Sequence, residues 1–339
     1  MSNSKTFDQL FKTLKHSSLT EIGSNAGAIM ETFLDLDREQ IRQQAEAVYA
    51  WAEQQAAQKP LVFIYGKLLR AFSYFYTEQY DKALPELTEL QRLFEEQHDP
   101  DGLAVTLNFQ GSIYRTFGNV DLALKACWSA LEQLTKSGKF QFFLIANHVN
   151  IGGIFFDRKH YEQAIPHFTT ALEMAEKMKK DYWIIYSLHG LGKVYLMQKK
   201  YNEAKASFEQ AMQVANGYQH PLSVSNSLTE LGNYYFAIGH YAEAEDYHRR
   251  SLEVREQHKL IGGAVTNCIR LGEIYIQQFK PEEAITIIEK GMKLAEQIQV
   301  KPKMYQLELL LSEIYQRKND LVKSLFHYKR FHEFREQVE

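Results

Sequence analysis

The side chains that could support catalysis or metal binding are scattered along this sequence. The segment "GLGKV" (Gly190–Val194) comes nearest to a phosphate-binding loop, but its lysine is not followed by Ser or Thr. None of the twelve histidines belongs to a His-Glu-x-x-His motif, and His327 and His332 fit an ordinary solvated helix surface. Cys127 and Cys268 have no zinc-ligand spacing. The sequence therefore predicts no catalytic residue, no metal site and no cofactor, and hence a protein that is not an enzyme.

The composition is that of an ordinary globular protein. Hydrophobic residues make up 45% of the 339 residues and charged residues 24%, with a formal net charge of -3. This balance argues against nucleic-acid binding, which usually needs a basic surplus. No apolar run is long enough to span a membrane, and the N-terminus lacks the apolar core of a secretory signal. We expect a cytoplasmic protein with no nucleic acid and no membrane among its partners.

Small residues recur with a period close to 40 through most of the sequence. The repeated position is occupied in order by Ala71, Gly111, Gly152, Gly192, Gly232, Gly272 and Ser312. The residue three positions later is always aromatic, and the residue twelve positions later is always Ala or Ser. Seven aligned copies predict an array of helical repeats in which each repeat packs against its neighbours.

The segment "LGKVYLMQKKYNEAKASFEQAM" (Leu191–Met212) resembles the tetratricopeptide repeat in its Gly, Tyr and two Ala positions. The period of 40 exceeds the common one of about 34 and is similar to that of kinesin light chains and bacterial peptide-pheromone receptors. The resemblance implies an all-α protein, a right-handed α-solenoid superhelix of about seven helix pairs. These repeats would cover about 61–99, 100–140, 141–180, 181–220, 221–260, 261–300 and 301–339.

The repeated glycines need a compensating interaction. Each glycine inside a helix costs about 1 kcal/mol relative to alanine, so five cost about 5 kcal/mol, the lower end of a domain's net stability. The resemblance implies that the small residue of the first helix lets the second helix of the pair approach closely. We therefore expect the glycines to be packing residues. Pro281 fits the first turn of a second helix, where its missing N–H costs nothing.

Residues 1–60 are less regular and are expected to form an N-terminal helical cap or a degenerate repeat. We expect an amphipathic helix over Thr6–Lys15, followed by "GSNAG" (Gly23–Gly27) and a long helix around Arg38–Gln58. The aromatic stretch Phe63–Tyr76 is either covered by this cap or forms an open ligand site.

In tetratricopeptide superhelices the first helix of each pair lines a concave groove. The resemblance places groove residues six and three positions before the repeated small residue, and one, four and five positions after it. The candidate peptide-binding residues at or beside these positions are Asn108, Ser112, Arg115, Asn147, Asn150, Phe156, Tyr186, His189, Lys193, Asn226, Thr229, Asn233, Phe236 and Glu273. Of these, Asn147 and Asn150 are expected at the edge of the groove.

The chemistry of these residues suits an extended peptide. Side-chain amides can both donate to and accept from a peptide backbone, and the aromatic residues would form side-chain pockets. The alternative is that polar residues simply line a water-filled concave face. The carboxylate clamp of chaperone-binding relatives is not reproduced, because Lys193 and Arg115 stand alone, so recognition of a C-terminal carboxylate is not expected.

The C-terminal segment keeps an apolar face to its last residues, formed by Leu325, Tyr328, Phe331, Phe334 and Val338. Either this helix pairs with another chain, as in a homodimer, or the natural protein continues. The resemblance favours continuation into an effector domain, as in bacterial sensor proteins. We therefore predict a non-catalytic module that binds a peptide or protein segment in its groove, as the sensory or regulatory region of a bacterial signalling protein. The alternative is a structural scaffold or adaptor that assembles through its helical ends.

Overall fold

The computed structural model describes residues 2–18, 21–137, 140–298 and 300–336 of the chain. Within these ranges the regular structure consists of helices, and no strand occurs. The all-α solenoid expected from the repeat is therefore confirmed. In the same ranges no helix is both long and apolar enough to cross a membrane.

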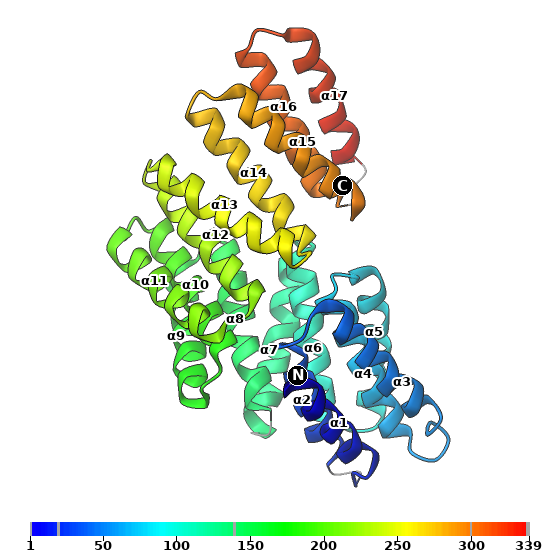
Figure 1. Ribbon diagram of the computed structural model, residues 1–339. Helices are drawn as coiled ribbons and strands as arrows, with labels where there is room; N and C mark the ends of the chain where they lie inside the picture. Colours follow the sequence, from blue (N-terminus) through cyan, green and yellow to red (C-terminus); the bar gives the residue numbers. More distant parts are fainter. Residues whose placement is uncertain (1, 19–20, 138–139, 299, 337–339) are drawn as a thin grey trace. The chain divides into compact units, whose positions relative to one another are not determined.

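Three helices precede the repeats: α1 (Ser2–Lys15), α2 (Ile22–Phe33) and α3 (Arg38–Glu53) (Figure 1). The third helix starts with a capping box, because the Asp37 carboxylate accepts from the Gln40 backbone N–H at 2.8 Å and the Gln40 side chain accepts from the Asp37 N–H. It ends at Glu53, before the expected Gln58.

The segment Gly23–Gly27, which lies between the two expected N-terminal helices, is itself helical and belongs to α2. A methyl group at Gly23 would lie 2.6 Å from the Tyr65 hydroxyl oxygen, and one at Gly27 would lie 2.8 Å from the Phe140 ring. The two glycines let α2 pack against these rings. This tertiary packing outweighs the poor helix propensity of glycine.

Helix pairs follow one another from α4 to the end of the described chain (Figure 1). The successive pairs are α4 (Pro60–Tyr76) with α5 (Tyr80–Glu96), α6 (Pro100–Thr116) with α7 (Val120–Ser137), α8 (Gln141–Asp157) with α9 (Tyr161–Met178), α10 (Asp181–Met197) with α11 (Tyr201–Tyr218), α12 (Pro221–Ala237) with α13 (Tyr241–Gln257), α14 (Ile261–Gln277) with α15 (Pro281–Gln297), and α16 (Lys301–Arg317) with α17 (Leu321–Glu336). As expected, Pro281 is the first residue of its helix.

A left-handed backbone residue ends the first helix of each pair. In the seven pairs this residue has φ between 58° and 81°, and it is Glu78, Gly118, Lys159, Lys199, Gly239, Phe279 or Asn319. The turn therefore repeats with the same period as the helices, although only two copies use glycine, the residue that tolerates this conformation without strain.

The repeated glycines pack against the second helix of their own pair. A methyl group at Gly111 would lie 2.4 Å from the Cys127 sulfur, and one at Gly232 would lie 2.8 Å from the His248 ring. In both cases the obstructing residue comes sixteen positions after the glycine. Cys127 and His248 are fully buried, so a larger residue would push the two helices apart. The expectation that the glycines are packing residues is confirmed.

The chain divides into two compact units, Met1–Val194 and Tyr195–Glu339, with the boundary inside α10. In the first unit, α2 covers the aromatic stripe of α4. The rings of Phe33 and Phe72 are 5.7 Å apart, and Tyr65 and Phe72 are fully buried. The cap therefore closes this part of the first helix face. The core of the second unit is built from the inner faces of α13 to α16, with Cys268, Ile288 and Leu307 at its centre.

Candidate functional site

A small cavity of about 40 Å³ lies where α4, α6, α8 and α10 converge in the first unit. Its apolar wall is formed by Phe75, Tyr76, Phe109, Phe142, Phe143, Ala146 and Trp183. Its polar wall is formed by three of the predicted groove residues, Asn108, Ser112 and Asn150. A cavity of this size holds one or a few water molecules, or the tip of an inserted side chain.

The three asparagines of the predicted amide series contact one another. The Asn108 Oδ1 atom accepts from the Asn150 side-chain amide at 2.9 Å and from the Asn147 amide at 3.3 Å. The expected edge position of Asn147 is wrong, because this residue is fully buried and Asn108 is only 2% exposed. Of the three, Asn150 is half-buried and open to the cavity.

Two buried polar atoms, one on a residue of the cavity wall and one on a residue hydrogen-bonded to that wall, have no hydrogen-bond partner within the described chain. They are the Trp183 Nε1 donor and the Asn147 Oδ1 acceptor. Leaving such a group unpaired costs about 1–3 kcal/mol. Buried polar groups in folded proteins are nearly always paired with protein, water or ligand, so these two atoms mark the cavity as a place where a polar partner would be stabilised.

Aromatic rings continue from the cavity along α10. The Phe142 and Trp183 rings are 5.5 Å apart, and the Tyr182 and Tyr186 rings are 4.6 Å apart. Burial raises the pKa of Tyr76 far above its ordinary value, so this hydroxyl stays protonated. Among the predicted residues of α10, Tyr186 and Lys193 are half-buried while His189 is buried.

The predicted Arg115 is engaged by the next repeat. Its Nε donates to the Asp157 carboxylate at 2.6 Å. A methyl group at Gly153 would lie 2.4 Å from the Arg115 guanidinium. Glycine at this position thus makes room for the arginine. The predicted Phe156, also on α8, is half-buried with its ring 5.8 Å from Tyr161.

In the second unit most of the predicted residues take part in hydrogen bonds within the protein. The Asn226 Oδ1 atom accepts from Arg255 Nη2 at 2.8 Å, and the buried Thr229 hydroxyl donates to the Ser225 carbonyl at 2.9 Å. Asn233 and Glu273 interact within their own helices.

Asn233 donates to the Glu230 carboxylate at 3.2 Å, and Glu273 accepts from Arg270 at 2.7 Å. Phe236 instead lines a wide surface pocket of about 590 Å³ together with Tyr201, Tyr234 and Tyr241.

Buried polar residues also form a row five positions before the repeated glycine, and of these only Asn147 was predicted from the sequence as a candidate site residue. They are Thr106, Asn147, Ser187, Ser227 and Asn267, all fully buried. The signal was present in the sequence, because this position is polar in five successive copies. The other four were missed because the groove positions considered were six and three before the glycine.

In the second unit this row connects to a buried cation. The Asn267 side-chain oxygen accepts from Arg255 at 2.6 Å and from Ser251 at 3.1 Å, and its amide lies 3.2 Å from His248 Nδ1. Burial, and then the positive charges of Arg270 and Arg255, lower the pKa of His248 to about 3. The imidazole is therefore neutral at physiological pH.

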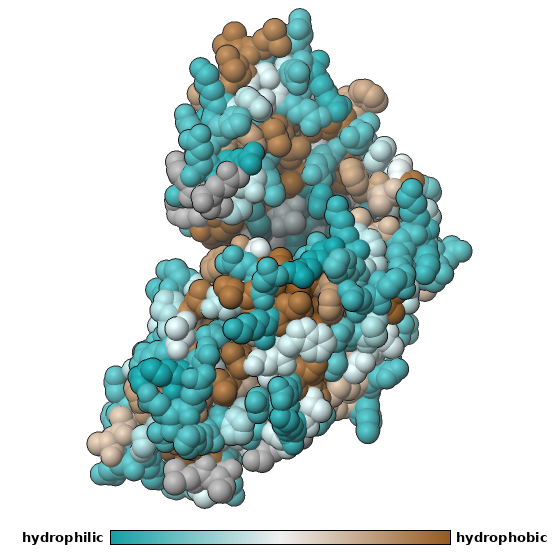
Figure 2. All heavy atoms as spheres, turned by 180° about the vertical axis from the view of Figure 1, so that it is seen from behind, coloured by the Kyte–Doolittle hydropathy of each residue, from teal (hydrophilic) through white to brown (hydrophobic). Residues whose placement is uncertain are grey.

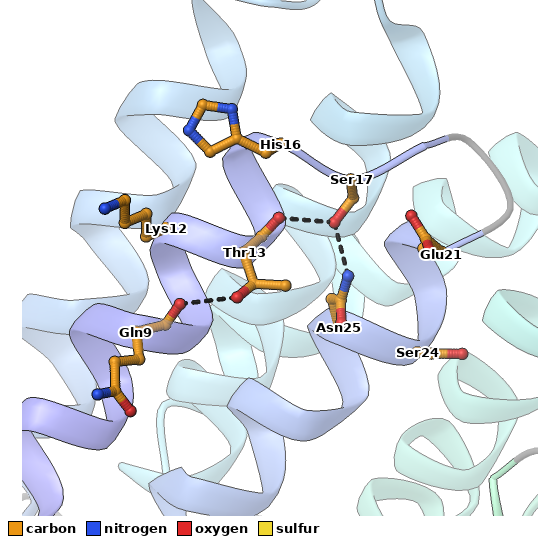
Figure 3. A pocket seen from close by; sticks show the side chains of 8 residues that line it. All are labelled: Gln9, Lys12, Thr13, His16, Ser17, Glu21, Ser24 and Asn25. Atoms are coloured by element: carbon orange, nitrogen blue, oxygen red, sulfur yellow. Dashed lines mark hydrogen bonds between the residues drawn. The ribbon is translucent and has the colours of Figure 1, made fainter.

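A second open pocket of about 590 Å³ lies between α1 and α2 and is lined mainly by polar side chains (Figure 3). Its groups bond to one another: the Asn25 amide donates to the Ser17 hydroxyl at 2.6 Å, and Ser17 donates to the Thr13 carbonyl at 2.9 Å. The Asn25 and Ser17 side chains are thus partnered within the protein, and the pocket points to no particular ligand.

The last helix, α17, has no buried residue. Its exposed apolar side chains are Leu321, Val322, Leu325, Phe326 and Tyr328, with Val322 83% exposed. Apolar surface is visible at this end of the array, at the top of Figure 2. Of the other residues expected on the apolar face, Phe331 and Phe334 are half-buried, and Val338 lies outside the described residues.

Both cysteines, Cys127 and Cys268, are buried and free, and burial raises the pKa of each thiol to about 12. Within the described part of the chain, no group of three or more His, Cys, Asp or Glu side chains converges on one point where it could hold a metal ion.

Models of the tetratricopeptide repeat match residues 143–217, 224–258 and 265–298. No curated protein matches the sequence. Among solved structures, a Rap protein complexed with competence and sporulation factor matches with a TM-score of 0.67 at 14% identity, over 99% of this chain and 98% of that chain. NprR in complex with its cognate peptide NprX has a TM-score of 0.67 at 20% identity, over 88% of this chain and 85% of that chain.

Aspartyl phosphate phosphatase F from Bacillus subtilis is also similar, with a TM-score of 0.61 at 15% identity, over 98% of this chain and 94% of that chain. At such identities the likeness establishes the fold. These three segments are therefore tetratricopeptide repeats, and they lie within helix pairs that recur every 40 residues.

Proposed function

We propose that this protein is a peptide-binding regulatory module, and that the cavity between α4, α6, α8 and α10 receives part of the ligand. The observation that carries the proposal is the pair of buried, unpartnered polar atoms, Trp183 Nε1 and Asn147 Oδ1, at or beside a cavity walled by aromatic rings and amides. A peptide supplies both a carbonyl acceptor and an N–H donor, together with an apolar side chain.

The proposed binding mode follows from the residues at the cavity. The Asn150 and Ser112 side chains are half-buried and reach the cavity from neighbouring helices. They would bond to the peptide backbone, while an apolar side chain would enter between the rings of Phe75 and Phe142. Ligand sites of this kind are mostly apolar, with a few placed polar groups that set orientation.

A regulatory role agrees with the proteins of similar fold, since the Rap protein and NprR structures hold a signalling factor or a cognate peptide. We propose that this chain likewise responds to a peptide or protein segment, in a bacterial signalling protein, without catalysing a reaction. In the second unit, the residues proposed to contact the peptide include Asn226, Asn233, Phe236 and Glu273.

The test is the affinity of a peptide selected against the wild-type protein from a random library. We expect Asn150→Ala and Trp183→Phe each to weaken binding by about 5- to 150-fold, which corresponds to the loss of about 1–3 kcal/mol per unpaired group. Asn202→Ala removes an exposed amide at the start of α11 and serves as the matched control. Equal affinity of the wild type and the Asn108→Ala/Asn233→Ala variant would refute the groove assignment.

A second candidate function, an assembly scaffold, is supported by the exposed apolar side chains of α17. Self-association through this helix would bury Val322 and Phe326. Light scattering across a concentration series would then show an oligomer that Val322→Glu abolishes. A strictly monomeric wild-type chain would exclude this role for α17.

A further inference from the structure

Two histidines of the third repeat face each other away from the cavity. His148 of α8 and His167 of α9 have their Nδ1 atoms 3.1 Å apart and their ring centroids 5.3 Å apart, and both side chains are half-buried. Burial, and then repulsion from His167, lower the pKa of His148 to about 4, and burial also lowers the pKa of His167. Both imidazoles are therefore neutral near pH 7, with ring nitrogens available as acceptors or metal ligands.

The fold does not require histidine at these two positions. His148 lies four residues before the repeated glycine, Gly152, and His167 lies fifteen residues after it. The same two positions hold Leu107 and Ala126 in the second repeat, Leu228 and Tyr247 in the fifth, and Cys268 and Ile287 in the sixth. In the last repeat they hold Glu308 and His327, whose side chains also meet, at 2.7 Å. The two positions are thus brought together by the repeat itself, and the second, fifth and sixth copies fill them without histidine or any charged residue.

Aromatic neighbours hold the pair in place and leave it accessible. The Phe155 ring stacks on His167 with a centroid distance of 5.7 Å, and the Trp128 ring meets His167 edge-on at 5.5 Å. Both imidazoles are half-buried and Trp128 beside them is 42% exposed, so the pair lies at the protein surface, where water and small ions can reach it. Such neighbours restrict the rotation of the imidazole, which is how the surroundings of a metal ligand usually orient it.

The spacing of the two nitrogens suits a metal ion. Zinc binds imidazole nitrogen at about 2.0–2.1 Å in tetrahedral geometry, which puts two nitrogen ligands about 3.3 Å apart. The observed 3.1 Å needs only a small ring rotation to match. We propose that His148 and His167 form a binding site for a divalent transition-metal ion of the Zn²⁺ type. Water would complete the coordination, since within the described residues no third protein ligand converges there.

The competing arrangement is a direct hydrogen bond between the two rings. It needs one imidazole to carry its proton on Nδ1. Binding of zinc requires both rings to carry their protons on Nε2, so one proton moves within its own ring and the charge of the protein is unchanged. Imidazole is a preferred ligand for zinc, copper and nickel but not for magnesium or calcium, so the two arrangements differ in their response to added Zn²⁺.

The test is calorimetric titration of the untagged full chain with ZnCl₂ at pH 7.5, with MgCl₂ as the comparison ion. The double variant His148→Leu/His167→Ala places the residues of the second repeat at both positions, and its fold is checked by circular dichroism. We expect it to bind one Zn²⁺ equivalent fewer than the wild type. The single variants His148→Gln and His167→Gln should each weaken that equivalent by at least about tenfold.

The matched control is His160→Gln, because His160 stacks on the same Phe155 ring without meeting the pair. It should bind zinc like the wild type. As a local readout, Cu²⁺ bound at the pair should quench the fluorescence of Trp128, and Trp128→Phe should remove that quenching. Equal Zn²⁺ binding by the wild type and the double variant would overturn the proposal and leave the pair as a hydrogen bond.

Discussion

Replacing Gly111 by alanine tests the central packing argument. A Cβ at this position of α6 would lie 2.4 Å from the Cys127 sulfur and 3.3 Å from the Ala123 carbonyl oxygen of α7. Because Cys127 is fully buried, the two helices must separate. Overpacking of a core costs about 1–3 kcal/mol, while alanine gains about 1 kcal/mol of helix propensity over glycine. The expected net result is a destabilisation of up to about 2 kcal/mol.

Gly217 provides the matched control, because it lies in the last turn of α11 and a Cβ there would have nothing within 4 Å. Gly217→Ala should therefore stabilise its helix by up to about 1 kcal/mol. The same chemical change is thus expected to have opposite signs at the two sites. The double variant Gly111→Ala/Cys127→Ala removes the obstructing sulfur and should recover most of the loss, giving a coupling energy of about 1–3 kcal/mol.

Hydrogen exchange of the α6 and α7 amides, compared with those of α11, is the suitable assay. Repeat arrays often unfold in parts, so a single melting temperature would not report the local effect. If Gly111→Ala slows exchange as much as Gly217→Ala does, close helix approach is not the reason for glycine at this position. The same conclusion would follow if Cys127→Ala and Gly111→Ala acted additively.

Three further predictions concern buried polar groups. Glu308, only 1% exposed, contacts two side chains of α17, His327 at 2.7 Å and Arg330 at 3.1 Å. Glu308→Gln should therefore lower the local stability of α17 by about 1–3 kcal/mol and speed amide exchange throughout this helix. Unchanged exchange would show that apolar contacts alone hold the helix in place. The pKa of His248 is lowered to about 3 in the folded protein, so below about pH 6.5 the unfolded chain binds one more proton than the folded one, and the stability of the second unit should fall as the pH drops from 6.5 towards 3. Urea unfolding at a series of pH values should show that the free energy of unfolding of His248→Gln depends less steeply on pH than that of the wild type. Equal pH dependence of the two proteins would contradict the assignment. Burial raises the pKa of the Cys127 and Cys268 thiols to about 12, so both should resist a thiol reagent at pH 8 in the native protein and react after denaturation. Rapid labelling of the native protein would show that the reagent reaches at least one of the two cysteines.

The sequence by itself determined the repeat and its helix pairs. Glycine, aromatic and alanine positions report local packing between the two helices of one pair, and that packing depends on residues close in the chain. For this reason Gly111 and Gly232 could be read as packing residues before their neighbours Cys127 and His248 were known. The repeating pattern also indicated the fold class, since only helices of matching length can stack with a constant period.

The tertiary structure decided how deeply each groove residue is buried and what it contacts. The hydrogen bond from Asn150 to Asn108 joins residues 42 positions apart, and Asn147, expected at an edge, is buried between repeats. The helicity of Gly23–Gly27 likewise depends on the rings of Tyr65 in α4 and of Phe140, the residue that precedes α8. Burial of a side chain is set by every surface that packs on it, and those surfaces come from other repeats. Periodicity along one helix shows which residues share a face, but only the assembled neighbours decide whether that face meets water, a ring or another amide.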